Sequence, residues 1–269
     1  METLRLRYSY YGWRARIGLL VPAANVVMEP EMARMLPEGV SVHASRLVLA
    51  GAYSDKSAGV MVASVAQAAA LLRMIDPSVV AFGCTSSSFL EDEQEIRRKI
   101  EEATGAPAIT ASGAILRALR ALGIRKLAVA TPYPKFINEE ERRWLEREGF
   151  TVLDIQGLDL GKDEYEVKLI GRQPPQVAYA LALRVARCGP DGLFISCGNF
   201  STAPIIEALE RHLGLPVVTS TQATLWHALR TAGVRASIDG YGALMKRYKF
   251  GDRTTPRWRV PCRIAHHRD

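Results

Sequence analysis

The sequence has few cysteines, and none of them form a pattern that builds a structural site. There is no C-x-x-C pair and no regular spacing among the four cysteines, which are Cys84, Cys188, Cys197 and Cys262. This argues against a zinc knuckle and against a disulfide framework. The five histidines show no metal-ligand spacing, so we expect no metal. The glycine-rich loops that hold nucleotide cofactors are also missing from the sequence, so we expect no cofactor.

Long apolar runs are missing as well. No stretch approaches the roughly 20 apolar residues that span a bilayer, and Pro22 interrupts the first apolar run, unlike the core of a signal peptide. These features predict a cytoplasmic protein with no membrane partner. The length of 269 residues, with 48% hydrophobic and 23% charged residues, suits one large α/β domain or two small ones.

The net charge of +7 lies mainly at the two ends of the chain. Residues 246–269 hold eight lysines and arginines against two aspartates, and residues 1–16 hold four arginines against one glutamate. A nucleic-acid-binding fold would carry its basic stripe on the folded body, so we expect no nucleic acid partner and interpret 246–269 as a basic C-terminal tail. A module that binds an acidic partner through this tail is an alternative, and it predicts that deleting the tail abolishes function.

Short apolar, β-branched runs alternate with helical patterns along the chain, which predicts an α/β fold with parallel sheets covered by helices. The predicted strands are 16–21, 40–48, 79–83, 108–110, 127–130, 152–154, 192–196 and 217–219. The chain also contains a weak duplication. The segment 16–22 resembles 126–132, 80–84 resembles 193–197, and 118–124 resembles 228–234.

The duplication predicts two pseudo-symmetric, doubly wound Rossmann-like lobes. The first would comprise residues 1–115 plus 220–245, and the second residues 116–219. Because ligands bind at the carboxyl ends of strands in open α/β sheets, Cys84 and Cys197 should lie on opposite walls of an active-site cleft between the lobes.

Each of these two cysteines ends a predicted buried strand and precedes a predicted helix, a position that favours an anion or a thiolate. Ser88 and Glu91 fit the capping box of the next helix. The alternative is that both cysteines are buried apolar residues beside ordinary caps, as in a binding protein whose cysteines are incidental. Their matched places in the repeat favour the functional interpretation.

Two more polar residues follow strands. Asn25 and Tyr133 could hold a carboxylate or a developing enolate by hydrogen bonds, or they could serve as a cap and as an aromatic residue between the lobes. The acidic pairs Glu29/Glu31 and 139–141 lie at helix starts, where we expect solvated side chains that favour the helix dipole.

Several motifs together resemble one known group of enzymes. They are Val21-Pro22-Ala23-Ala24-Asn25 with Met28-Glu29-Pro30-Glu31, Leu36-Pro37-Glu38-Gly39-Val40, Gly83-Cys84-Thr85, Thr131-Pro132-Tyr133 and Ser196-Cys197-Gly198-Asn199. In these motifs the chain resembles the maleate cis-trans isomerase and arylmalonate decarboxylase group of the aspartate/glutamate racemase superfamily.

This resemblance implies a cofactor-independent enzyme that acts on a small carboxylate. Cys84 would add to maleate as the nucleophile, and Cys197 would act as acid and base at the neighbouring carbon before fumarate leaves. The residues that would bind the substrate are Asn25, Thr85, Ser86, Tyr133, Gly198 and Asn199. A homo-oligomer, most simply a dimer, is the default expectation for such an enzyme.

The resemblance also implies two alternatives. Arylmalonate decarboxylases keep one working cysteine, the counterpart of Cys197, and have glycine where Cys84 stands, so two cysteines favour an isomerase or an amino-acid racemase. The 85–89 loop instead looks like that of a decarboxylase. Isomerases also carry a carboxylate-binding Asn in the loop shortly before a Gly-Arg pair. Here the stretch before Gly171-Arg172 contains Asp163, Glu164 and Lys168 but no Asn.

Overall fold

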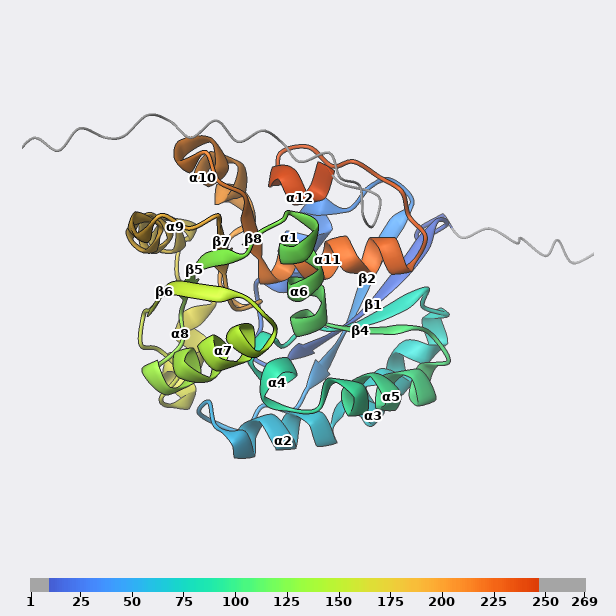
Figure 1. The fold of residues 1–269 in the computed structure, drawn as a ribbon. Coiled ribbons are helices and arrows are strands. Elements are labelled where there is room, and N and C mark those ends of the chain that lie inside the picture. The colour runs from blue at the N-terminus through green and yellow to red at the C-terminus, as the bar shows by residue number, and fades with distance from the viewer. Residues whose placement is uncertain (1–9, 247–269) are drawn as a thin grey trace, which may run out of the picture.

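A computed structural model of the protein describes residues 10–246. The chain forms two parallel β-sheets of four strands each, in the orders β2-β1-β3-β4 and β6-β5-β7-β8 (Figure 1). The strands are β1 (Ala15–Pro22), β2 (Val40–Leu47), β3 (Val79–Phe82), β4 (Ala108–Thr110), β5 (Lys126–Thr131), β6 (Thr151–Gly157), β7 (Gly192–Ile195) and β8 (Val217–Thr219). The predicted α/β class and all eight predicted strands are confirmed.

The two sheets share one topology. Strands β1 to β4 occupy the same places in the first sheet as β5 to β8 in the second, which confirms the duplication predicted from the sequence. In both sheets the first and third strands of the repeat are central and almost fully buried, as expected for parallel strands covered on both faces.

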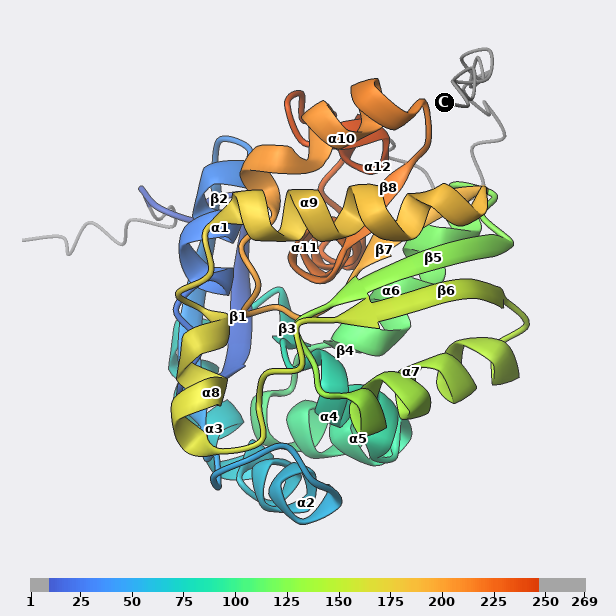
Figure 2. The ribbon, with the colours of Figure 1, turned by 90° about the vertical axis from the view of Figure 1, so that its left-hand side faces the viewer.

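Helices cover both faces of each sheet. They are α1 (Met28–Met35), α2 (Asp55–Ala63), α3 (Val65–Leu72), α4 (Thr85–Leu90), α5 (Glu93–Thr104), α6 (Ala111–Ala121), α7 (Lys135–Arg147), α8 (Glu164–Ile170), α9 (Pro175–Val185), α10 (Ile206–Leu213), α11 (Ser220–Thr231) and α12 (Gly242–Lys246), with 3₁₀ turns η1 (Arg73–Ile75), η2 (Ala186–Cys188) and η3 (Ala203–Ile205). Helices α3 and α5 pack on one face of the first sheet, and α1 and α11 pack on the other. The second sheet lies between α7 and α9 (Figure 2).

The lobes are joined by a pair of helices. Helix α6 follows β4, α11 follows β8, and the two pack on each other while α6 touches β4 and β8 and α11 touches both sheets. The boundaries 1–115 plus 220–245 and 116–219 stay a prediction, in which the first boundary falls within α6. Of the predicted basic tail, residues 247–269 lie outside the described part of the chain.

The expectation that no stretch approaches the length of a membrane span is wrong, because the 20 residues Lys56–Ile75 are long and apolar enough to cross a membrane by length and composition alone. This stretch is divided among α2, α3 and η1. The buried side chains of α3 face the first sheet and α5, so its apolar character serves the core.

Candidate active site

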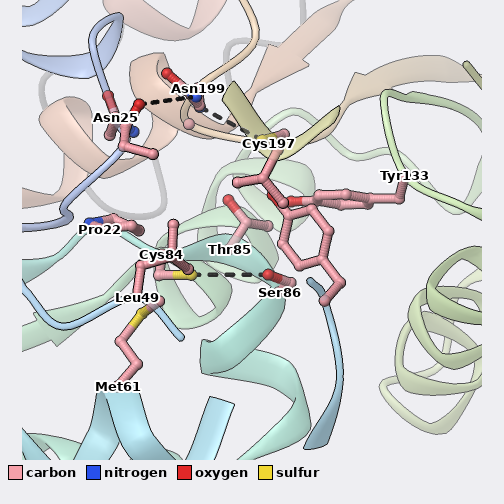
Figure 3. Close-up of a pocket in the computed structure, with 15 residues that line it drawn as sticks. Pro22, Asn25, Leu49, Met61, Cys84, Thr85, Ser86, Tyr133, Cys197 and Asn199 are labelled. Atoms are coloured by element: carbon pink, nitrogen blue, oxygen red, sulfur yellow. Dashed lines mark hydrogen bonds between the residues drawn. The ribbon is translucent and has the colours of Figure 1, made fainter. Parts of the chain in front are cut away.

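A small pocket opens where the carboxyl ends of the central strands of both sheets meet. Its cavity volume is about 30 Å³, and it is lined by Pro22, Ala24, Asn25, Leu49, Tyr53, Met61, Gly83, Cys84, Thr85, Ser86, Tyr133, Val167, Cys197, Gly198 and Asn199 (Figure 3). All eight site residues predicted from the sequence line this one pocket. Their individual roles stay predictions.

Cys84 lies at the start of a helix that the sequence did not reveal. It is the N-cap residue of α4, and the first intrahelical hydrogen bond runs from the Ser88 amide to the Cys84 carbonyl, 3.1 Å. The Thr85 and Ser86 amides therefore remain available at the helix start. The Cys84 thiol lies 3.3 Å from Ser87 Oγ and 3.7 Å from Ser86 Oγ. Among the described residues, Thr85 Oγ1 is buried without a hydrogen-bond partner.

The predicted capping box of Ser88 and Glu91 is wrong. Ser88 lies inside α4, where its hydroxyl donates to the Thr85 carbonyl, 2.8 Å. The next helix, α5, is capped instead by Asp92, whose carboxylate accepts from the Gln94 and Glu95 amides.

Cys197 occupies a backbone conformation that is unusual for a residue with a side chain. Its φ is +84°, in the left-handed region that favours glycine. The turn aims the Asn199 amide at the Cys197 sulfur, 3.4 Å away, and brings the Phe200 amide to the Cys197 carbonyl, 3.2 Å. Strained backbone of this kind clusters at functional sites.

Burial raises the pKa of the Cys197 thiol to about 12, while the Asn199 amide and the hydroxyls of Tyr133 and Tyr53 act to lower it by hydrogen bonding to the thiolate. Figure 3 shows Tyr133 directed into the pocket beside Cys197. Its ring meets that of Tyr53 edge to face, with centroids 5.3 Å apart. Cys197 is therefore a neutral thiol at pH 7, and it is surrounded by donors that can stabilise its anion.

Two asparagines lie beside the thiols, and Asn199 connects the two lobes. Asn25 Oδ1 accepts from the Val27 and Met28 amides, so the side-chain NH₂ is the part of Asn25 that can serve a carboxylate. Asn199 Oδ1 accepts from the Val26 amide, 3.0 Å, and its NH₂ donates to the Ala24 carbonyl, 3.4 Å (Figure 3). The second-lobe loop is thus fastened to the loop that follows β1.

Two glycines let the thiol-bearing loops approach each other closely. A Cβ on Gly198 would lie 3.1 Å from the Gly83 carbonyl and 3.0 Å from Met28 Sδ, and a Cβ on Gly83 would lie 2.8 Å from the same sulfur. The lobes therefore touch through main chain directly beside Cys84 and Cys197.

The pocket lining is neutral and includes apolar side chains from both lobes. None of the described lining residues is a lysine, arginine, aspartate or glutamate. Leu49, Met61 and Val167 supply the apolar surface, and Val167 comes from α8, the helix that ends just before Gly171. Carboxylates would therefore be held by amides and hydroxyls rather than by an ion pair.

Two acidic side chains that we expected in solvent are buried, so the prediction of solvated first turns is wrong for them. Glu31 accepts hydrogen bonds across the lobe interface from residues 201–203. Glu141 is fully buried and accepts from Ser196 Oγ at 2.5 Å. Burial raises the pKa of Glu141 to about 8. Glu29 and Glu139 follow the expectation more closely, in exposed ion pairs with Arg46 and Lys135.

The sequence did not single out Tyr53, the second phenol beside Cys197. A signal was available, since Tyr53 is an aromatic residue in a loop of small residues that follows a strand and precedes a helix. Loops in that position reach the carboxyl edge of a parallel sheet.

Comparison with known proteins agrees with this geometry. The sequence model of the arylmalonate decarboxylase family matches residues 17–245, nearly all of the described chain. The protein belongs to the arylmalonate decarboxylase family. The resemblance to the maleate isomerase and arylmalonate decarboxylase group is thereby confirmed.

Relatives of this family member include both kinds of enzyme. Arylmalonate decarboxylase of Bordetella bronchiseptica is 33% identical over 85% of this chain and 95% of its own length. Maleate isomerase of Nocardia farcinica is 29% identical over 86% of this chain and 95% of its own. A solved structure of the Nocardia enzyme, a cysteine-to-serine mutant with a covalently bound succinylcysteine intermediate, has a TM-score of 0.78 at 26% identity and covers 86% of this chain and 98% of its own.

Proposed function

We propose that this family member is a cofactor-independent isomerase of a small cis-dicarboxylate, of the maleate-to-fumarate type. The observation that carries the proposal is the presence of two thiols, Cys84 and Cys197, from matched loops of the two lobes in one small pocket. The succinylcysteine intermediate in the related isomerase supports covalent chemistry at one such thiol.

The reaction begins at Cys84. Its sulfur, as the thiolate, forms a bond to one alkene carbon of maleate, and the electron pair of the double bond moves toward the neighbouring carbon and its carboxylate. The Ser86 hydroxyl, close to the Cys84 sulfur, can donate to the thiolate before it attacks. An activated thiolate of this kind turns one difficult step into two easier ones.

Cys197 then donates its proton to the neighbouring carbon. Because burial keeps this thiol neutral, the proton is available when the adduct forms, and Tyr53 and Tyr133 stabilise the thiolate that remains. The new single bond rotates, Cys197 takes the proton back, and the carbon–sulfur bond breaks to release fumarate. Both thiols end in their starting states, so no cofactor is consumed.

The substrate carboxylates would be held by neutral donors. The candidates are the amides at the start of α4, the unpartnered Thr85 hydroxyl, the Asn25 NH₂ and the main chain of Gly198 and Asn199. Donors fixed before the reaction stabilise developing negative charge without reorganisation.

A second function is supported by the apolar side chains of the pocket lining. Val167 lies in the pocket on the helix before Gly171, where the resemblance would place a carboxylate-binding Asn. Together with Leu49 and Met61, it suits a substrate with one carboxylate region and one hydrocarbon substituent. Decarboxylation of an arylmalonate, or racemisation of a related acid or an amino acid, is therefore the alternative.

Proton NMR distinguishes the isomerase from the decarboxylase. Maleate is incubated with wild type, Cys84→Ala and Cys197→Ser, and phenylmalonate is tested in parallel. We expect fumarate from wild type alone and a maleate adduct on Cys84 in Cys197→Ser, detected by mass spectrometry. Fumarate from Cys84→Ala would overturn the mechanism, and phenylacetate without fumarate would establish the decarboxylase. A cytoplasmic location and a homodimer stay predictions.

A further inference from the structure

The motif Met28-Glu29-Pro30-Glu31 lies on α1, outside the pocket lining, and the mechanism above does not use it. The Glu31 side chain is only 4% exposed, although it belongs to the first turn of a surface helix. Its carboxylate points into the second lobe, so its burial needs a reason.

The Glu31 carboxylate accepts four hydrogen bonds from one short segment of the second lobe. Oε1 accepts from the Thr202 amide at 2.7 Å, the Ala203 amide at 3.0 Å and the Ser201 hydroxyl at 3.0 Å, and Oε2 accepts from the Thr202 hydroxyl at 3.4 Å. Thr202 is the N-cap residue of η3 but makes no capping bond with its own side chain. Glu31 therefore supplies this cap from the other lobe.

The segment that Glu31 holds is the continuation of the Cys197 loop. Between Cys197 and the anchored residues lie Asn199, which is bonded to the loop after β1, and Phe200, which is fully buried. The Cys197 conformation, with φ of +84°, must be maintained by such surrounding contacts, because isolated residues with a side chain avoid it. Glu31 is the acidic side chain that fastens the far end of this loop.

We propose that Glu31 is a positioning residue that holds the Cys197 loop, and with it the Cys197 sulfur, in its reactive geometry. The expected effect of Glu31 on turnover rests on the proposed function. The effect on the geometry of Cys197 can be measured without any substrate.

The test compares Glu31→Ala, Glu31→Asp and Glu31→Gln with wild type. Glutamine keeps an oxygen that can replace Oε1, which accepts three of the four bonds, whereas alanine has no acceptor and aspartate draws the carboxylate back by one methylene group. Glu210→Ala is the matched control, because Glu210 is also buried and also accepts from two amides, but these belong to Val217 and Ala243 rather than to the continuation of the Cys197 loop.

Two readouts are taken. One is kcat and KM for maleate, and the other is the rate of iodoacetamide labelling at Cys197 and at Cys84, resolved by peptide mass spectrometry. We expect kcat to fall about 100-fold in Glu31→Ala, the loss typical of a misplacement of about 1 Å, with a smaller change in KM. Labelling of Cys197 should become faster while labelling of Cys84 is unchanged, and Glu31→Gln should behave nearly as wild type.

Wild-type kcat and Cys197 labelling in Glu31→Ala or Glu31→Asp would overturn the proposal. The proposal would also be wrong if Glu31→Gln were as impaired as Glu31→Ala. It would equally be wrong if the labelling rate rose by the same factor at both cysteines and also rose in Glu210→Ala. If Glu31→Ala does not fold, the comparison of Glu31→Asp with Glu31→Gln tests the role of Glu31, since only Glu31→Asp should lose kcat and gain Cys197 labelling. Absence of fumarate from wild type would refute the proposed function alone, and the labelling contrast would still decide the role of Glu31.

Discussion

Tyr53 and Tyr133 come from different lobes and meet edge to face, with ring centroids 5.3 Å apart, beside the sulfur of Cys197. One follows β2 in the first sheet, and the other follows β5 in the second. The contact places two hydroxyl donors around one buried thiol, so the group proposed to act as acid and base depends on both halves of the chain.

Replacing either tyrosine by phenylalanine should slow turnover. Tyr53→Phe and Tyr133→Phe keep the ring contact but remove a donor to the Cys197 thiolate. A hydrogen bond to a charged group contributes roughly 1.5–3 kcal/mol, so kcat should fall about tenfold or more in each variant. Tyr165→Phe, at an exposed site on α8, is the control. Unchanged kcat in both single variants would show that the thiolate does not use these hydroxyls.

Replacing the two cysteines by glycine should affect stability unequally. Cys197 has a positive φ and Cys84 does not. A left-handed conformation costs a residue with a side chain roughly 1–2 kcal/mol, and glycine avoids this cost. Cys197→Gly should therefore be less destabilising than Cys84→Gly by about 1 kcal/mol in urea unfolding, although both variants should be inactive. Equal losses would mean that the Cys197 turn is not strained.

Glu141 should make the stability of the fold depend on pH. Its pKa is about 8 in the folded protein against an ordinary value of 4.5. Between these values the folded chain retains a proton that the unfolded chain has released, so stability falls as the pH rises from about 4.5 to 8.

Glu141→Gln should remove this slope. The difference between the free energies of unfolding at pH 5 and pH 8 should shrink by an amount on the order of a few kcal/mol. Glu139→Gln, at an exposed site on the same helix, should leave the difference unchanged. The prediction fails if Glu141→Gln keeps the slope of wild type.

Gly171→Ala should impair the site without unfolding the protein. The backbone there is helical, with φ of −70°, so alanine meets no conformational strain. Its Cβ would lie 2.7 Å from Asn199 Oδ1 and 2.8 Å from Val26 Cγ2, which forces Asn199 to move. We expect a lower kcat/KM at nearly wild-type stability. Gly59→Ala, in α2 with only a 3.8 Å contact, should keep activity and gain up to about 1 kcal/mol of stability.

Local patterns in the sequence were sufficient to predict the strands and the matched cysteines, because strand periodicity and repetition are properties of neighbouring residues. Helix α4 was missed because Thr85, Ser86, Ser87 and Ser88 have modest helix propensity and read as a polar loop. These residues are buried, and α4 packs against α2, α5, α6 and α7, so tertiary contacts stabilise the helix.

The buried acids could not be predicted from local sequence. Glu31 finds its partners about 170 positions away, and Glu141 finds Ser196 55 positions away. Glu31 lies in the first turn of α1 and Glu141 in the second turn of α7, which begins at Lys135 rather than at Glu139. Acidic residues near a helix start are normally solvated, and only the tertiary arrangement of the two lobes changes this. The same holds for Tyr53, whose place at Cys197 depends on contact between lobes.

The two thiols stand in equivalent places of a duplicated fold, yet their surroundings differ. Serine hydroxyls lie beside Cys84, whereas phenols and a positive-φ turn lie beside Cys197. The two faces of a flat substrate held between them would therefore meet chemically different groups of the enzyme. In heavy water, deuterium would then enter from one side only, and a saturated product or trapped adduct would be a single stereoisomer. The stereoselectivity of the reaction would then arise because two loops have diverged in an otherwise pseudo-symmetric fold.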